Sequence, residues 1–321
     1  MTVATLLLDA CRAQNRVLLT GPIGPDGDSL GACLALQRVL GSVGVSSAVV
    51  GSVPRRYRWM PGITEVIPDR ALSGRWPAVV VLDGDRHRLT EPAGQAFTQA
   101  DFRGIVDHHG STRPDGYDLA WLEPRAGSTC EMLLAALPAW GVSLDRELAT
   151  LLYTGIVFDT GGFRHANTTP ATLSAAAELL ALGVDHAGIV SRVLHERTAA
   201  GLRLSGQIYE GFSLRCGGGL CIGQASVGDL ATIAEGDLEG VPENLLQVEG
   251  VEVSALLLER PNGAVKYSLR SRGRFDVSAM AARLSPTGGG HARAAGAVVR
   301  ATLSEAADRL EAAFEASGGG E

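Results

Sequence analysis

Lysine is almost absent from this sequence: Lys266 is the only one among 321 residues, and the formal net charge is −7. An acidic protein lacks the broad positive field with which proteins coat long duplex nucleic acid. The cations are concentrated locally, because residues 260–300 contain seven arginines and Lys266 but a single acid, Asp276. This distribution favours a short or small anionic partner over a chromosome.

Cysteines are few, and long apolar runs are missing. The five cysteines are odd in number and have no CxxC spacing, which argues against a disulfide framework and a zinc ribbon. Cys216 and Cys221 are close enough to suggest a pair, but a disulfide is unusual in a cytosolic protein. No apolar run approaches the ~20 residues that span a bilayer, and residues 1–8 have neither a positive flank nor a cleavage-site pattern. We therefore expect a cytoplasmic protein with reduced cysteines and no membrane partner.

The length favours two domains, since domains typically contain ~100 to 200 residues. In the first ~190 residues, β-branched runs alternate with amphipathic stretches, which is typical of an α/β fold with a parallel sheet wrapped by helices. The predicted strands are 16–20, 47–50, 78–82 and 104–106, and the predicted helices include 29–40 and a segment around 148–156. A hydroxyl cap and a proline in Thr168-Thr169-Pro170 predict the start of another helix.

The remainder predicts a smaller, mixed α+β domain, with a cleft between the two domains. Its predicted strands are 219–225, 251–259 and 264–272, and its last helix is 304–316. One more helix is predicted over 185–197 as the connector. The predicted domains are thus a catalytic domain over 1–184, a helical linker over 185–203 and a substrate-binding domain over 204–321.

Acidic and histidine residues follow three of the predicted strands. Asp26 and Asp28 follow 16–20, Asp83 follows 78–82, and Asp107-His108-His109 follows 104–106. The carboxyl ends of parallel strands lie along one edge, so these residues should converge there. Aspartates gathered so closely would repel one another unless a cation neutralised them. Carboxylates with imidazole fit manganese better than zinc or calcium, so the pattern predicts one or two Mn²⁺ ions that act on a phosphoryl group.

Each of these residues also has an ordinary interpretation. Asp28 before Ser29 is typical of a helix cap, His109 alone is typical of a surface or core histidine, and Asp159 alone is typical of a turn. The combination favours a metal site, because helix caps do not explain acids and histidines after several different strands.

Two features of the second domain suggest anion binding. Alternation over 265–272 places Lys266, Arg270 and Arg272 on one face of a strand, which is either a solvated outer face or a platform for phosphates and bases. The segment Gly288-Gly289-Gly290-His291 lacks side chains where a backbone could approach an anion. A glycine triplet alone is weak support, but beside His291 and the cationic strand it favours a substrate loop.

These motifs together resemble a known family. The segments that carry the resemblance are Pro25-Asp26-Gly27-Asp28-Ser29-Leu30-Gly31, Val81-Leu82-Asp83, Asp107-His108-His109, Asp159-Thr160-Gly161-Gly162-Phe163-Arg164 with Thr168-Thr169-Pro170, and Gly288-Gly289-Gly290-His291 with Ala294-Ala295-Gly296. In this order they resemble the DHH phosphoesterases with a DHH-associated C-terminal domain, and most closely the nanoRNase A type. Members of that group act as oligoribonucleases and as phosphatases on 3'-phosphoadenosine 5'-phosphate.

The resemblance implies roles for individual residues. Asp28, Asp83, His108 and Asp159 would hold one Mn²⁺, and Asp83 would bridge to a second ion that Asp26 also binds. His109, with Asp107 of the same motif, would act on the scissile phosphate. The glycine loop with His291 resembles the family's substrate loop and would bind the nucleotide. Arginine stacks on bases and binds phosphate, so Arg270 and Arg272, on the same face as Lys266, would hold a short single strand of nucleic acid.

One departure concerns the second ion. The family usually has a histidine where this chain has Pro22, and proline cannot ligate a metal. We expect this position to be weaker, empty at low manganese, or completed by water or another residue, with His87 and His165 as candidates.

The expected function is hydrolysis of short single-stranded RNA or DNA to mononucleotides. The same site also suits a phosphatase of 3'-phosphoadenosine 5'-phosphate or a cyclic-dinucleotide phosphodiesterase. A manganese pyrophosphatase shares the first domain, and a nucleotide-binding regulator with weakened catalysis is the alternative outside enzymes. Preferred length, polarity of attack, RNA or DNA preference and oligomeric state, a homodimer included, stay open.

Overall fold

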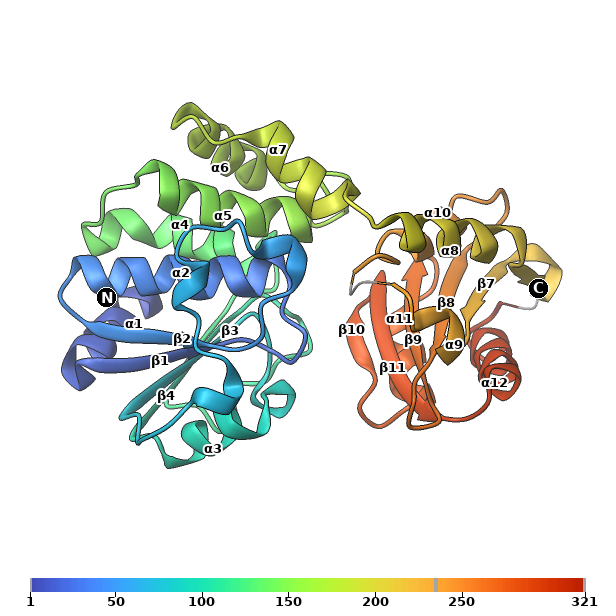
Figure 1. Ribbon diagram of the computed structural model, residues 1–321, viewed down its shortest axis with the longest axis horizontal. Helices are drawn as coiled ribbons and strands as arrows, with labels where there is room; N and C mark the ends of the chain where they lie inside the picture. Colours follow the sequence, from blue (N-terminus) through green and yellow to red (C-terminus); the bar gives the residue numbers. More distant parts are fainter. Residues whose placement is uncertain (1, 234–235, 320–321) are drawn as a thin grey trace. The chain divides into compact units, whose positions relative to one another are not determined.

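The computed structural model describes residues 2–233 and 236–319, and the chain divides into two compact units, Met1–Glu196 and Arg197–Glu321. Figure 1 shows a layered α/β arrangement in the first unit, drawn from blue to green, and a second sheet with its own helices, drawn in yellow to red. Each unit has its own sheet and its own core.

The first unit contains a five-stranded sheet in the order β2-β1-β3-β4-β5, in which every neighbouring pair is parallel. Its strands are β1 (Arg16–Thr20), β2 (Ser46–Val50), β3 (Ala78–Leu82), β4 (Phe102–Asp107) and β5 (Leu119–Leu122). Its α-helices are α1 (Val3–Gln14), α2 (Gly27–Ser42), α3 (Glu91–Gln99), α4 (Thr129–Trp140), α5 (Arg146–Asp159), α6 (Pro170–Ala181) and α7 (His186–Val190).

Helices cover both faces of this sheet (Figure 1). Val80 of β3 belongs to the core formed with α1, α2, α4 and α5, whereas its neighbours Val79 and Val81 belong to a second core formed with α3. Successive side chains of a strand point to opposite faces, so a strand covered on both faces is apolar throughout. Such strands are easily recognised in a sequence, and β1 and β3 have the predicted bounds.

The predicted parallel α/β fold of the first unit is confirmed, but two of its elements were not predicted. The strand β5 has only Leu, Ala and Trp and no β-branched residue, and it pairs with β4 at the sheet edge. Helix α1 precedes the first predicted strand and packs Leu7, Leu8 and Cys11 into the core. The predicted helix start at Thr168-Thr169-Pro170 is confirmed, because Thr169 caps α6 and Pro170 is its first residue.

The boundary between the two units falls between Glu196 and Arg197, within the segment 185–203 that was predicted as the linker. The helix predicted over 185–197 is observed as α7 followed by a π-helical turn, Ser191–His195. The next helix, α8 (Ala199–Glu210), belongs to the second unit and is capped by Thr198. The predicted linker is therefore two helices with a short break, because the Thr198 hydroxyl starts a new helix.

The second unit is smaller and mixed, as predicted. Its six-stranded sheet has the order β10-β11-β9-β8-β7-β6, with β7 and β8 parallel and the other pairs antiparallel. The strands are β6 (Ser213–Arg215), β7 (Leu220–Ala225), β8 (Val253–Glu259), β9 (Ala264–Ser271), β10 (Gly289–His291) and β11 (Ala294–Arg300). The helices after α8 are α9 (Val227–Leu230), α10 (Val241–Leu245), α11 (Val277–Leu284) and α12 (Leu303–Glu315).

The second sheet also has two cores. Leu257 of β8 packs with α11 and α12, whereas Leu256 packs with α8 and α10.

Among the described residues, no helix combines the length and the apolar character needed to cross a membrane. Cys216 and Cys221 are free, as are the other cysteines, so the suggested pair does not form.

Candidate metal centre

Four side chains from different elements of the first unit converge at the carboxyl edge of its sheet. Asp28 of α2, Asp83 after β3, His108 after β4 and Asp159 at the end of α5 each place one ligand atom within 4.8 Å of the others. Asp28, Asp83 and His108 are buried, and the Asp159 side chain is 18% exposed. The structure therefore brings together all four residues that the family resemblance implied as ligands of one ion.

The backbone at Asp83 is unusual. This residue has a φ of 58°, in the left-handed region that residues other than glycine rarely adopt. Aspartate tolerates this conformation better than most residues, and the Asp83 amide donates to the carbonyl of Val106, 3.0 Å away. The turn ends β3 abruptly and places the carboxylate beside His108, whose Nε2 lies 3.6 Å from Asp83 Oδ1.

The helix cap at the start of α2 is Asp26, and not Asp28 as the ordinary interpretation proposed. Asp26 Oδ1 accepts hydrogen bonds from the amides of Asp28 and Ser29 and from the Ser29 hydroxyl. Asp28 lies in the first turn of the helix, where its side chain points into the protein and is fully buried.

The carboxylate of Asp28 is held by the amino end of α4. It accepts hydrogen bonds from the backbone amides of Thr129 at 2.7 Å and Cys130 at 2.9 Å. Gly155 of α5 makes this approach possible, because a Cβ there would lie 2.4 Å from both Asp28 Oδ1 and Cys130 Sγ. The amides of Thr129 and Cys130 were not among the predicted site groups, although Ser128-Thr129-Cys130-Glu131 has the S-x-x-E pattern of a helix start.

The imidazole of His108 is oriented by a backbone contact. Its Nδ1 lies 3.2 Å from the carbonyl oxygen of Ala126, to which it can donate. The Nε2 atom then faces the carboxylates and lies 2.7 Å from Asp159 Oδ2. A backbone acceptor on one ring nitrogen is the common arrangement that directs the other nitrogen to a metal. His108 is thus arranged as a ligand through Nε2.

The electrostatics of this cluster favour a cation. Burial, and then the charge of Asp159, raise the pKa of Asp28 to about 6. Burial and the charge of Asp28 likewise raise the pKa of Asp83 well above its ordinary value. Burial opposes protonation of His108, but the carboxylates of Asp159 and Asp83 outweigh it and raise its pKa. Without a metal ion, protons compensate the clustered negative charge, so the donor set fits a divalent cation that would replace them.

The sequence offered His87 and His165 as ligands of a second ion in place of Pro22. Pro22 lies against Gly84, where an added Cβ would be 3.2 Å from three atoms of the proline ring, so Pro22 lies next to the turn at Asp83. The side chain of His87 is 77% exposed, with Nε2 3.8 Å from Asp85 Oδ1. His165 is exposed, and its Nδ1 lies 3.0 Å from the backbone oxygen of Asp159. Neither histidine belongs to a group of ligand atoms among the described residues.

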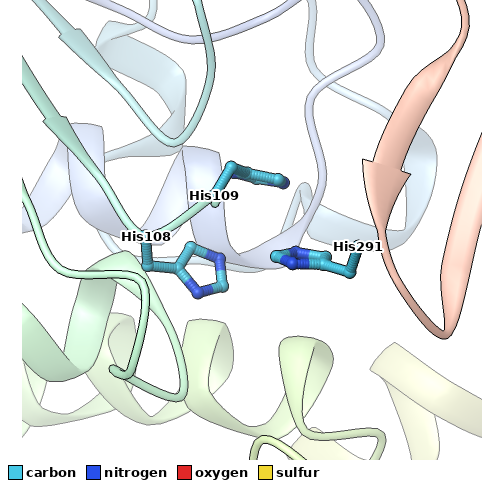
Figure 2. A group of neighbouring side chains, drawn as sticks. All are labelled: His108, His109 and His291. Carbon is cyan, nitrogen blue, oxygen red and sulfur yellow. The ribbon is translucent and has the colours of Figure 1, made fainter. Parts of the chain in front are cut away.

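His109 is paired with Asp107 of the same turn. Its Nδ1 lies 2.7 Å from Asp107 Oδ1, and Asp107 also accepts a hydrogen bond from the Thr112 hydroxyl. Burial would raise the pKa of Asp107, but its hydrogen bonds and the charge of His109 lower it. Figure 2 shows the rings of His108 and His109 leaving adjacent backbone positions in different directions. Asp107 thus orients His109, with Nε2 as the nitrogen opposite the carboxylate.

In the second unit, only part of the predicted cationic face lies on β9, and both of its arginines have partners within the protein. Lys266 is exposed, and the alternation along β9 is observed. Arg270 forms an ion pair with Glu243 of α10. Arg272 lies beyond the end of β9 and donates to the backbone oxygens of Val251 and Leu246. Both guanidinium groups therefore hold the α10 region against the sheet.

The glycines before His291 serve different purposes. A Cβ at Gly288 would lie 2.0 Å from the oxygen of Ala281. Gly290 has a φ of 141°, and a Cβ there would lie 2.6 Å from the oxygen of Ala294. Gly289 has open space around its Cβ position. Packing of the protein itself requires Gly288 and Gly290, which leaves Gly289 as the glycine open to a ligand. Gly289 lies two positions before the exposed His291, the last residue of β10 (Figure 2).

Comparison with known proteins places these features in a family. Residues 16–156 match the DHH family, N-terminal domain, and residues 224–317 match the DHHA1 domain. A bifunctional oligoribonuclease and PAP phosphatase NrnA from Thermus thermophilus is 36% identical over 305 residues, covering 94% of this chain and 90% of that protein. This chain belongs to the DHH family. Asp28, Asp83 and His108 lie within the residues that match the N-terminal domain of this family, and Asp159 lies just beyond them.

Other relatives of this DHH protein are more distant. The bifunctional oligoribonuclease and PAP phosphatase NrnA from Bacillus subtilis is 26% identical, over 97% of both chains. The cyclic-di-AMP phosphodiesterase GdpP from Geobacillus thermodenitrificans is 27% identical over 97% of this chain but only 49% of its own length. The crystal structure of an exopolyphosphatase-related protein from Bacteroides fragilis has a TM-score of 0.86 at 24% identity, covering 98% of this chain and 96% of that one, which confirms the fold.

Proposed function

We propose that this protein is a manganese-dependent phosphodiesterase that hydrolyses short single-stranded RNA or DNA oligonucleotides to mononucleotides. The observation that carries the proposal is the buried group Asp28, Asp83, His108 and Asp159, in a chain 36% identical to an oligoribonuclease over nearly its whole length. Three carboxylates and one imidazole suit Mn²⁺ better than zinc or calcium. A divalent ion held there supplies Lewis-acid activation of water and of the phosphoryl group.

The protein's own residues have separate tasks in this reaction. Asp28, Asp83, His108 and Asp159 would hold the ion, and their burial excludes competing water. Asp107 fixes the ring of His109 through Nδ1, so that Nε2 can exchange a proton with a phosphate or leaving-group oxygen. This division leaves the fully buried Asp107 as a positioning group and the partly exposed His109 as the group that meets substrate.

A second ion would be bound more weakly. Asp26 and Asp83 remain as its ligands, but Pro22 offers no donor atom. One oxygen of Asp26 already accepts three hydrogen bonds at the start of α2. A titration that finds one tight Mn²⁺ and one weak Mn²⁺ per chain would agree with this part of the proposal, and two equally tight ions would contradict it.

The second unit would supply the contacts to the nucleotide. Lys266 is exposed on β9 and suits a phosphate, and the backbone at Gly289 and the ring of His291 suit the terminal nucleotide. Arg270 and Arg272 would join them only by exchanging the contacts that they make within the protein. Contacts to backbone and base faces do not read sequence, so we expect little sequence preference.

A second activity is phosphate removal from 3'-phosphoadenosine 5'-phosphate, which the name of the Thermus thermophilus relative favours. Cyclic-dinucleotide hydrolysis is a weaker alternative, because the GdpP relative is less identical and about twice as long.

Product analysis tests these activities side by side. RNAs of two, three and five nucleotides, 3'-phosphoadenosine 5'-phosphate and cyclic di-AMP are incubated with the protein and Mn²⁺, with EDTA and the Asp159→Ala variant as controls. We expect mononucleotides from the short RNAs and no product with EDTA or with the variant. Equal turnover by Asp159→Ala would refute the assignment, and nucleotide binding without any turnover would indicate a regulator.

A further inference from the structure

Two of the four proposed metal ligands are positioned by one short segment, residues 126–130, between β5 and α4. The carbonyl of Ala126 contacts Nδ1 of His108. The amides of Thr129 and Cys130 hold both oxygens of Asp28. A displacement of this segment would therefore move two ligands at once. What holds the segment in place determines how well the ligand set is formed.

Glu131 and Thr172 hold this segment from one side. Glu131 Oε2 accepts hydrogen bonds from the amide of Gly127 at 3.1 Å and from the Thr172 hydroxyl at 2.7 Å. Thr172 is fully buried and lies in the first turn of α6. A Cβ at Gly127 would lie 2.6 Å from Glu131 Oε2 and 2.8 Å from Thr172 Oγ1, so these groups pack directly on the segment.

Asn167 connects the same segment to the remaining part of the site. Its Nδ2 donates to the carbonyl of Gly127 at 2.9 Å and to the backbone oxygen of Asp159 at 3.2 Å. One amide group therefore links the segment that holds His108 and Asp28 to the residue that contributes the Asp159 carboxylate. Asn167 precedes the helix start at Thr169, so α6 fixes its place.

We propose that Asn167 and Glu131 are positioning residues of the metal centre, which set the affinity for Mn²⁺ without touching the ion or the substrate. This inference rests on the proposed function, because it requires the metal centre described above. Groups behind metal ligands typically change metal affinity by about 10- to 100-fold when they are removed.

Manganese binding to purified variants tests the proposal, with free Mn²⁺ measured by electron paramagnetic resonance. We expect Asn167→Ala and Glu131→Ala to weaken binding by ~10-fold or more. Asn167→Asp should weaken it further, because a carboxylate would face the oxygens of Gly127 and Asp159. Glu131→Gln keeps an acceptor for Gly127 and Thr172 and should restore affinity to near that of the unaltered protein.

Ser174→Ala is the matched control, because its hydroxyl donates only within α6, to Pro170. Circular dichroism and the melting temperature of each variant without added metal identify any loss of folding. A folded Asn167→Ala protein with unchanged Mn²⁺ affinity would overturn the proposal. Absence of Mn²⁺ binding by the unaltered protein would overturn it as well, whereas tight binding without hydrolysis would overturn only the proposed function.

Discussion

His108 Nε2 lies 2.7 Å from Asp159 Oδ2, so the turn after β4 and the last residue of α5 meet through an ion pair. The neighbouring carboxylates raise the pKa of His108 and so favour a proton on its ring. A metal ion must displace this proton before it can use Nε2. Metal binding and protonation therefore compete for the same atoms.

Manganese affinity is expected to fall as the pH is lowered through about 6, the pKa of Asp28. The pKa of Asp28 is higher in the folded protein than its ordinary value, so protonation of this carboxyl stabilises the fold at low pH. This stabilisation is lost as the pH rises through about 6. Added Mn²⁺ should reverse this trend, because it replaces the protons. Melting temperatures with and without Mn²⁺ on both sides of this pH measure the effect. A manganese-induced shift that does not change across this range would contradict the assignment.

Asp83→Asn should make the protein without added metal more stable near pH 7 while abolishing hydrolysis. Burial and the charge of Asp28 raise the pKa of Asp83, so near pH 7 folding must either protonate this carboxyl or bury its charge, and a neutral amide avoids that cost. The same change removes a proposed ligand, and Mn²⁺ should no longer raise the melting temperature. Asp101→Asn, at an exposed site before β4, serves as control and should leave both properties unchanged. Retention of manganese-dependent hydrolysis by Asp83→Asn would rule out its role.

Asp107→Asn should lower kcat by about 100-fold while leaving Mn²⁺ affinity within a few-fold of the unaltered protein. The neutral amide accepts a weaker hydrogen bond from His109 Nδ1 than the carboxylate does, so the orientation and tautomer of the ring are less firmly fixed. His109→Ala should have a similar effect. Steady-state kinetics on a dinucleotide at saturating Mn²⁺ measure kcat. If His109→Ala keeps full activity, another group transfers the proton.

Gly289→Ala should raise KM for a dinucleotide and leave the fold unchanged, because nothing lies within 4 Å of its Cβ position in the protein itself. KM should rise because the added methyl group would occupy space that the substrate backbone approaches. Gly288→Ala is a contrasting variant, since its Cβ would collide with the oxygen of Ala281 and destabilise the unit. An unchanged KM in a folded Gly289→Ala protein would argue against substrate contact at this glycine.

The sequence predicted β1 and β3 with their observed bounds, because nearly all of their residues are buried and apolar. It also predicted that Asp28, Asp83 and His108 would converge, since parallel strands bring their carboxyl ends to one edge, whereas Asp159, at the end of α5, was expected only from the family resemblance. The edge strand β5 was missed because it has no β-branched residue and pairing with β4 stabilises it. Helix α1 was missed although its Ala and Leu residues and the Thr2 cap favour a helix.

By itself, the sequence determined the fold class and the acids and histidines at the strand ends, because these follow from local residue patterns and from the direction of parallel strands. Only the tertiary structure decided that Asp26 caps α2 while Asp28 faces the amino end of α4, since both aspartates lie in one turn. It also decided that Arg272 binds backbone oxygens near α10. Such partners are distant in sequence, so the packing of the whole unit selects them.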